Sequence, residues 1–482
     1  MLFNSWEFAA FFVVVLTLYY ALAHRWQNVL LLLASYAFYG AWDWRFLALL
    51  WTSTVVDFIA AHKLDRAETK RARRGWLGVS LATNLGILGF FKYFNFFLDS
   101  AVDGLDAIGV RADVAVLQVV LPVGISFYTF QTLAYTIDVY RGEQKPTRNW
   151  VAFALYVAYF PQLVAGPIER AKRLLPQLES PRRVTNDDLS AGAQLLLWGY
   201  VKKVVIGDSL ARYVDTIYNA PGDFDRMTLW LGMYAFTIQL YCDFSGYSDI
   251  ARGTSRLVGV KLMENFRQPF LTPNITEFWR RWHVSLSTWL RDYVYIPLGG
   301  NRVSPVRQYV NLFLTFVLGG LWHGANWTFV IWGALHGAFL CIHRLWLRGQ
   351  PAPYDRDPKG LREWITFVPA TILTFHLFAG SLVIFRCQTI ADAWTYVSGM
   401  FLSDIELHDF TYNRLFQGLI PTLAIYTCVV LSIDLSCRAS GQDVPCTDRM
   451  RWWTRGLVYA VAVFMLFYVR DAYVEPFFYF QF

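Results

Sequence analysis

Charged residues are scarce in this sequence of 482 residues. Asp, Glu, Lys and Arg make up 16% of it, whereas 55% is hydrophobic and the mean hydropathy is +0.32. A chain this apolar does not suit an ordinary soluble protein of that length. The net charge of +7 is modest, and a bias of basic loops toward the cytoplasm explains it better than nucleic-acid binding does. The sequence therefore predicts an integral membrane protein that contacts the lipid bilayer and binds no nucleic acid.

Paired cysteines and nucleotide-binding loops are missing as well. The absence of any CxxC pair argues against a disulfide framework or a zinc knuckle and favours buried thiols at Cys242, Cys341, Cys387, Cys428, Cys437 and Cys446. No GxxxxGK[ST] loop, GxGxxG turn or GxSxG elbow occurs, so nucleotide hydrolysis, Rossmann cofactors and serine-hydrolase chemistry have no support. His336 and His343 would stand about 10 Å apart along one helix, too far to share a metal ion. We expect no metal and no bound cofactor.

Apolar segments recur along almost the whole chain. Several fall short of the ~20 residues that a full span needs, so we expect about eleven spans with re-entrant and interfacial helices among them. The predicted fold is an all-α, multi-helix transmembrane bundle. We expect one domain over residues 1–482, with scaffold helices in 1–260, a catalytic region in 261–347 and C-terminal helices in 348–482. The stretches 392–410 and 438–455 are predicted to be connecting loops, and the aromatic end, 475–482, to dock back on the bundle.

Basic residues indicate the orientation. A cluster after the third apolar segment should be cytoplasmic, which places the N-terminus outside: Lys63, Arg66, Lys70, Arg71, Arg73 and Arg74. A full crossing through 150–168 would put the following basic residues outside as well, against the charge bias. Pro161, Gly166 and Pro167 interrupt that segment, and such breaks are tolerated where the backbone is buried in protein or lines a wet cavity. Residues 160–169 are therefore predicted to form a re-entrant turn.

The stretch from Asn274 to His336 concentrates the residues that could do chemistry. Tryptophans and leucines recur at helical spacing over 278–295, which predicts one amphipathic helix. Its polar face would carry Arg280, Arg281, His283, Ser285, Ser287 and Arg291, with Asp292 close by. Two interpretations are equally well supported. The helix is either an anchor at the membrane interface or a cationic wall that receives a phosphate-bearing acyl donor.

His323 lies among glycines and tryptophans, in Gly319-Gly-Leu-Trp-His323-Gly-Ala-Asn326-Trp. If a helix begins near Asn326, His323 stands at its entrance, where the helix dipole disfavours the imidazolium. A neutral imidazole there could accept a proton from a hydroxyl, although a purely structural histidine is an equal alternative. His336, thirteen residues on, could approach His323 only if the chain folds back; otherwise it serves at another depth of the same cavity.

A polar stretch over 241–253 carries Asp243 and Asp249 beside an apolar helix. Helix capping or pairing with Arg is the favoured interpretation, and orienting an imidazole is the alternative.

Several long motifs resemble those of the membrane-bound O-acyltransferases, in particular the bacterial polysaccharide branch typified by alginate O-acetyltransferase. The likeness covers nearly the whole chain. The motifs are Asn274-Ile-Thr-Glu-Phe-Trp-Arg-Arg-Trp-His283, Leu298-Gly-Gly-Asn-Arg302, Gly319-Gly-Leu-Trp-His323-Gly-Ala-Asn-Trp, and the segments 121–128, 137–142, 160–168 and 241–249.

The resemblance implies a helical bundle around a central funnel that opens to the cytoplasm. It implies that His323 is the essential histidine and His283 a second one. Acetyl-CoA or another thioester would supply the acetyl group. The group would cross the bacterial inner membrane to a separate periplasmic acetyltransferase, beside the polysaccharide export machinery. The aromatic C-terminus departs from the alginate enzyme, which leaves the polymer open.

The residues then suggest roles within such a reaction. His323 would act as general base, Asn326 or backbone amides near Gly324 would stabilise the oxyanion, and His283 with Arg280 and Arg281 would hold the donor. Asp292 and His336 are further candidates for substrate contacts. The alternatives are D-alanyl transfer to teichoic acid, or a transporter of acyl groups or polymer, or a scaffold, without chemistry.

Overall fold

Helices make up every regular element in the computed structural model, which describes residues 1–111, 117, 119–347, 358, 360–404, 414–445, 450–469 and 477–478. Five helical segments in these residues are long and apolar enough to span a membrane: His24–Arg66, Lys70–Ala107, Trp327–Leu347, Leu361–Arg386 and Gln417–Ser440. The prediction of an all-helical chain is confirmed for the described residues. The expected number of about eleven spans stays a prediction.

The contacts divide the described chain into two compact units. Unit 1 holds residues 1–192 and 251–263, and unit 2 holds residues 193–250 and 264–478. The helices of unit 1 are α1 (Trp6–Ala21), α2 (His24–Asp43), α3 (Leu47–Arg66), α4 (Lys70–Leu88), α5 (Phe94–Ala107), α6 (Ile125–Arg141), α7 (Trp150–Ala158), α8 (Phe160–Leu163) and α9 (Ala171–Glu179). Two helices continue from one unit into the other: α10 (Asn186–Tyr200) and α12 (Arg226–Leu257). The predicted single domain with its three parts stays a prediction.

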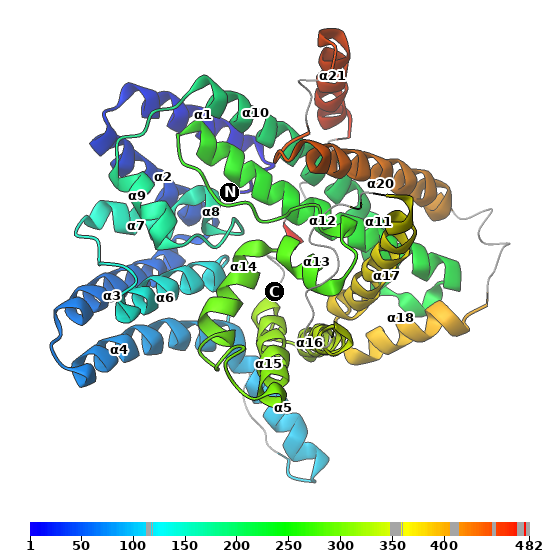
Figure 1. The fold of residues 1–482 in the computed structure, drawn as a ribbon, viewed down its shortest axis with the longest axis horizontal. Coiled ribbons are helices and arrows are strands. Elements are labelled where there is room, and N and C mark those ends of the chain that lie inside the picture. The colour runs from blue at the N-terminus through cyan, green and yellow to red at the C-terminus, as the bar shows by residue number, and fades with distance from the viewer. Residues whose placement is uncertain are drawn as a thin grey trace. The chain divides into compact units, whose positions relative to one another are not determined.

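Helices α3, α4 and α6 pack side by side in unit 1 (Figure 1). The Asp57 carboxylate is completely buried among them and accepts hydrogen bonds from Asn84 Nδ2 at 2.8 Å, from Thr136 Oγ1 at 3.3 Å and from the Ser80 hydroxyl. A buried carboxylate is tolerated when its oxygens are satisfied in this way. This polar cluster therefore joins the three helices as scaffold.

The chain between α7 and α9 turns back on itself. Helix α7 ends before Pro161, whose ring nitrogen has no hydrogen to donate. Lys172 Nζ, after the turn, lies 2.8 Å from Glu143 Oε2, before it. The chain thus leaves and returns at one side of unit 1, and the re-entrant turn stays a prediction.

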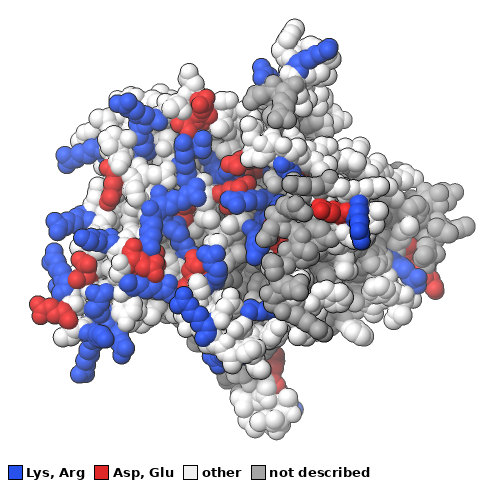
Figure 2. Space-filling model, in the orientation of Figure 1, with Lys and Arg blue, Asp and Glu red and all other residues white. Residues whose placement is uncertain are grey.

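Basic connections of unit 1 meet on the same side. Arg73, in the first turns of α4, donates a hydrogen bond of 2.8 Å to the carbonyl of Tyr140 near the end of α6. Figure 2 shows Lys and Arg side chains, with some Asp and Glu among them, spread over the left part of the view, which includes α3 and α4. The common side agrees with the predicted clustering of basic loops.

Unit 2 contains the candidate site. The helical elements of this unit include α11 (Asp208–Asn219), α13 (Ile275–Arg281), α14 (Val284–Leu290), the π-helical turn η6 (Arg291–Tyr295), α15 (Pro305–His323), α16 (Trp327–Leu347), α17 (Leu361–Arg386), α18 (Ile390–Leu402), α20 (Arg414–Ser440) and α21 (Trp452–Tyr468). Helices α15 and α16 form the most extensive helix pair, because Gly320 and Gly333 let their backbones approach closely. The pairing folds the chain back after Gly324, as the approach of His336 to His323 requires.

Two sequence predictions of local structure are wrong. Residues 390–402 form α18 where a loop was predicted, because Thr389 and Asp392 form a reciprocal capping box at its start. The amphipathic helix predicted over 278–295 is broken into α13, α14 and η6, with the break at Trp282 and His283. The predicted loop 438–455 is correct only between Ser440 and Trp452, and residues 446–449 lie outside the described ones.

The C-terminal aromatic segment docks as predicted where the structure describes it. The ring of Phe477 stacks on Tyr247 with centroids 4.7 Å apart, and the Phe478 N–H donates a hydrogen bond of 2.9 Å to Asp243 Oδ2. Residues 475–476 and 479–482 lie outside the described ones.

The cysteines differ among themselves. Cys242, Cys387 and Cys437 are buried, Cys341 is half-buried, and the prediction of a buried thiol is wrong for Cys428, which is exposed. Cys446 lies outside the described residues.

Candidate active site

His283 occupies a strained position at the start of α14. Its backbone is left-handed, with φ 45° and ψ 53°, a conformation that costs a residue other than glycine about 1–3 kcal/mol. Asn265 holds the segment in place: its carbonyl accepts from Val284 N at 3.0 Å, and its Oδ1 accepts from Ser285 N at 3.1 Å and Ser285 Oγ at 3.0 Å. The sequence analysis missed Asn265, because no local pattern links it to a turn almost twenty residues later.

His283 and His323 meet in one buried site. Their ring centroids lie 6.4 Å apart with the planes at 64°, and the two side chains belong to residues that are 0% and 4% exposed. Trp322 packs against both rings, at 5.9 Å from His283 and 5.0 Å from His323. Burial lowers the pKa of His283 to about 3, so this imidazole is neutral at physiological pH.

His323 is the last residue of α15, and α16 begins only at Trp327. The expectation that it stands at a helix entrance is therefore wrong, because the preceding helix runs up to the histidine itself. At the carboxyl end of α15 the helix dipole favours a positive charge. An imidazolium at this position would be stabilised by that dipole.

A cavity of about 740 Å³ in unit 2 reaches His323. It is lined at different points by Trp332, by Arg280 and Arg291, and by Arg344. Trp332 and Arg344 are twelve residues apart on α16, which separates them by about 18 Å along the helix axis. The cavity is therefore long and connects a buried imidazole with several guanidinium groups.

Arg291, which lies on the predicted polar face, and Arg344, which the sequence did not indicate, both line the cavity. Arg344 Nη1 donates hydrogen bonds to Asn301 Oδ1 at 3.0 Å and to the Tyr295 hydroxyl at 3.3 Å, so its guanidinium is held in place. His343 lines the same cavity, and its Nδ1 lies 2.8 Å from the Thr276 hydroxyl.

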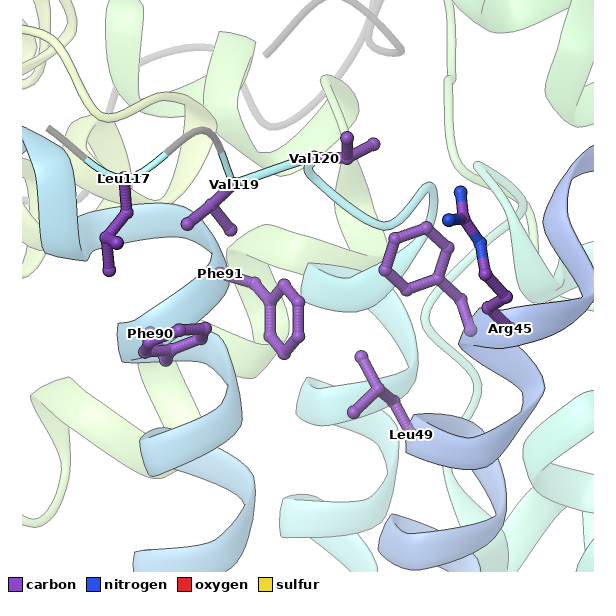
Figure 3. Close-up of a pocket in the computed structure, with 8 residues that line it drawn as sticks. Arg45, Leu49, Phe90, Phe91, Leu117, Val119 and Val120 are labelled. Atoms are coloured by element: carbon purple, nitrogen blue, oxygen red, sulfur yellow. The ribbon is translucent and has the colours of Figure 1, made fainter.

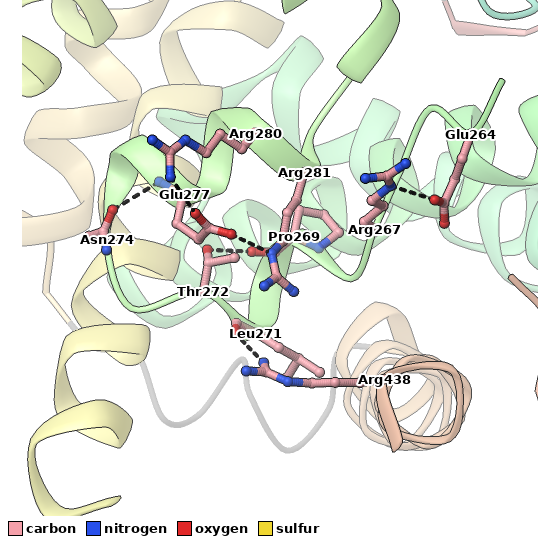
Figure 4. A network of polar contacts seen from close by, with 10 residues as sticks. All are labelled: Glu264, Arg267, Pro269, Leu271, Thr272, Asn274, Glu277, Arg280, Arg281 and Arg438. Carbon is pink, nitrogen blue, oxygen red and sulfur yellow. Dashed lines mark hydrogen bonds and ion pairs between the residues drawn. The ribbon is translucent and has the colours of Figure 1, made fainter. Parts of the chain in front are cut away.

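The predicted Arg280 and Arg281 share one carboxylate. Arg280 Nη1 lies 3.3 Å from Glu277 Oε2, and Arg281 Nε lies 2.9 Å from Glu277 Oε1 (Figure 4). Asn274 caps the same helix by accepting a hydrogen bond of 2.9 Å from Glu277 N. Arg280 lines the cavity, whereas Arg281 does not, so the structure brings only the first of the pair to His323's cavity.

The other predicted residues lie around this cavity without lining it. Asn326 Nδ2 donates to the Gln388 carbonyl at 2.7 Å, and its Oδ1 accepts from Thr328 N at 3.0 Å. Asp292 Oδ1 pairs with Arg291 Nε at 2.8 Å. His336 is completely buried and packs on Trp332, with ring centroids 4.7 Å apart.

The carboxylates of the polar stretch form ion pairs within unit 2. Asp243 Oδ1 lies 2.5 Å from Lys203 Nζ, and Asp249 Oδ2 lies 2.7 Å from Lys202 Nζ. The favoured interpretation of charge pairing holds for both, although the partners are lysines rather than the expected arginines.

A second cavity, of about 480 Å³ in unit 1, has a different character (Figure 3). Its walls are apolar apart from Arg45, whose guanidinium pairs with Asp43 at 2.6 Å. It offers hydrocarbon surface and no acid–base group, so the cavity at His323 is the better candidate for chemistry.

The chain belongs to the membrane-bound O-acyltransferase family. The family model matches residues 148–372, which include all the histidines of the candidate site. The protein is thus an O-acyltransferase and a multi-pass membrane protein.

Individual relatives show which proteins of the family this chain resembles. A protein named probable alginate O-acetylase from Azotobacter vinelandii is 44% identical over 436 residues, which cover 89% of this chain and 84% of that one. A protein of the same name from Pseudomonas putida is 40% identical over 508 aligned residues and covers both chains completely. The teichoic acid D-alanyltransferase of Bacillus subtilis is more distant, at 31% identity over 54% of this chain and 68% of its own length.

Proposed function

We propose that the protein takes acetyl groups from a cytoplasmic thioester, moves them across the bacterial inner membrane and serves the O-acetylation of an exported polysaccharide such as alginate. The observation that carries the proposal is the cavity that joins His323 to Arg280, Arg291 and Arg344. The names of the Azotobacter vinelandii and Pseudomonas putida relatives support alginate as the polymer.

His323 acts as the general base. It accepts the proton of an acceptor hydroxyl while the hydroxyl oxygen attacks the thioester carbonyl. The carbon–sulfur bond then breaks, and the imidazolium returns the proton to the departing thiolate. The end of α15 lowers the energy of the charged imidazolium between these two proton transfers.

The oxyanion of this reaction needs hydrogen-bond donors beside His323. Asn326 and the backbone amides near Gly324 are the proposed donors. The hydrogen bonds of Asn326 to Gln388 and Thr328 favour the amides.

Phosphate groups on the acyl donor account for the presence of cationic residues in the cavity. A thioester donor such as acetyl-CoA carries phosphates at one end of a long arm and the acyl group at the other. Arg280, Arg291 and Arg344 bind the phosphates, and the arm follows α16 toward Trp332 and His323. His283, neutral and completely buried, does not line the cavity, and its proposed role is to support the position of the His323 ring.

The basic connections of unit 1 support an orientation with these loops in the cytoplasm and the N-terminus outside. A funnel that opens to the cytoplasm and a periplasmic acetyltransferase as acceptor complete the proposed pathway. D-alanyl transfer is less well supported, because the relative that carries that name matches a smaller share of the chain at lower identity.

The experiment compares the O-acetyl content of exported polysaccharide and peptidoglycan in a deletion strain complemented with wild-type protein, His323→Ala or His62→Ala at equal membrane levels. The control histidine is His62 on α3, whose Nδ1 forms a hydrogen bond with the Phe58 carbonyl of the same helix. We expect ester loss from one polymer in the deletion strain and with His323→Ala, and none with His62→Ala. Normal acetylation with His323→Ala would reject the proposal in favour of a transporter or scaffold.

A further inference from the structure

Ser381, on α17, is a buried hydroxyl that joins three partners in unit 2. Its Oγ donates a hydrogen bond of 2.6 Å to the Phe378 carbonyl. Trp332 Nε1 donates to the same oxygen at 3.2 Å, and His336 Nε2 lies 2.9 Å from it. A hydroxyl has one proton to donate. When Ser381 donates it to the Phe378 carbonyl, His336 Nε2 carries a hydrogen and donates to Ser381 Oγ.

This arrangement fixes the tautomer of His336. With its hydrogen on Nε2, the ring presents an unprotonated Nδ1, which has no hydrogen-bond partner among the described residues. The ring is nonetheless completely buried, between Trp332 and Trp279, with centroids at 4.7 Å and 5.1 Å. The orientation of His336 thus depends on the single hydrogen bond to Ser381 and on aromatic packing.

Trp332 connects the hydrogen bonds of Ser381 to His323, the candidate base. Its ring meets the His323 ring edge to face, with centroids 5.2 Å apart and planes at 90°. Trp332 also lines the cavity, whereas Ser381 and His336 do not. One turn further along α17, Phe385 packs on both His323 and Trp332, at 5.4 Å and 5.0 Å.

We propose that Ser381 and His336 are positioning residues for acyl transfer. Together they hold the indole of Trp332 against His323 and thereby set the direction of the catalytic imidazole and the shape of the cavity beside it. The proposal rests on the proposed role of His323. Removing the Ser381 hydroxyl leaves Trp332 and His336 with buried N–H groups that must find other acceptors, so the Trp332 ring turns away from His323.

The test measures the initial rate at which exported polymer gains acetyl esters in the complemented deletion strain, normalised to folded protein in the membrane. The variants are Ser381→Ala, Ser381→Thr, Trp332→Phe and the double variant Ser381→Ala with Trp332→Phe. Thr374→Ala is the matched control, because Thr374 is also buried on α17 and its hydroxyl donates to the Ala370 carbonyl of its own helix.

We expect Ser381→Ala to lower the rate by roughly tenfold to a hundredfold, the loss typical of a misplaced catalytic group. Ser381→Thr, which keeps the hydroxyl, should restore the rate to within about threefold of wild type. The double variant should be no slower than the slower of its two single variants, because both remove the same hydrogen bond. Thr374→Ala should match wild type.

The outcomes separate this proposal from the function on which it rests. If His323→Ala is inactive while Ser381→Ala keeps the wild-type rate, the positioning role is wrong and the acyltransferase proposal stands. A Ser381→Thr rate as low as that of Ser381→Ala also rejects the positioning role, since the hydroxyl would not be the cause. Normal acetylation with His323→Ala would instead reject the acyltransferase function itself, on which the positioning role rests.

Discussion

His283 and His323 face each other edge to face, with ring centroids 6.4 Å apart, although forty residues separate them in the chain. One histidine stands at the break between two short helices and the other at the end of α15. Because both rings share Trp322 as a neighbour, a change at either one alters the surroundings of the other. The site therefore depends on backbone features as much as on the two side chains.

The backbone at His283 gives a first prediction. His283→Asn should keep the thermal stability of the purified protein close to that of wild type, because Asn tolerates the left-handed conformation. His283→Val should lower it clearly, because a β-branched residue is strained there. Acetyl transfer should fall with both variants. Equal melting temperatures for the Asn and Val variants would contradict the strain at this position.

Asn265 gives a second prediction. Asn265→Ala removes the side-chain acceptor for Ser285 N and Ser285 Oγ in a buried position, which should cost about 1–3 kcal/mol of stability. Acetyl transfer should fall as well, because the turn that carries His283 loses its support. Denaturation in detergent together with an activity assay checks both effects. A variant with wild-type stability and activity would show that the backbone bonds to Asn265 suffice.

The cationic cavity predicts a donor-binding phenotype. Arg344→Gln should raise the apparent KM for acetyl-CoA roughly threefold to tenfold and leave kcat nearly unchanged, since the guanidinium lies far from His323. Higher salt should weaken donor binding to wild type more than to the variant. The control is Arg226→Gln, because Arg226 donates to the Ser403 carbonyl and does not line the cavity. An unchanged KM for Arg344→Gln would exclude it from the donor site.

Glu169 predicts a pH dependence of stability. Burial raises the pKa of this carboxyl to about 7, against the opposing effects of the Met263 N–H and of Arg173, Arg252 and Arg170. A raised pKa means that the folded protein binds the proton more tightly than the unfolded chain. The protonated Glu169 carboxyl therefore contributes its full stabilisation of the folded protein below pH 4.5. This contribution is lost as the pH rises toward about 7, which lowers the free energy of unfolding by up to about 3 kcal/mol.

Glu169→Gln removes this titration and retains an acceptor for Met263 N. The variant should be more stable than wild type at pH 8 and should show a flatter melting temperature between pH 5 and pH 8. Parallel melting curves for the two proteins across that range would contradict a raised pKa at Glu169.

The sequence predicted the helical class and both histidines, because apolar segments and the Trp-His motifs are local signals. It could not predict the break at His283, since the apolar spacing of Trp279, Trp282 and Leu286 continues through it. That break depends on Asn265, whose contacts form only in the folded chain.

Two other structural features that were not predicted had a signal in the sequence. Thr389 and Asp392 have the spacing of a capping box, which would have predicted the start of α18. The place of His323 at the end of α15 could have followed from the apolar residues 311–321, which lead directly into the motif that ends at Gly324. Arg344 differs from both, because its part in the cavity depends on how α16 packs against the segment around Tyr295 and Asn301.

The most direct test of the central claim is acetyl transfer from radiolabelled acetyl-CoA in inside-out membrane vesicles that contain wild-type protein, His323→Ala or His62→Ala at equal levels. If His323 is the general base, His323→Ala should lower the rate by about 10²- to 10⁴-fold, and His62→Ala should match wild type. A His323→Ala rate within about twofold of wild type would contradict the account.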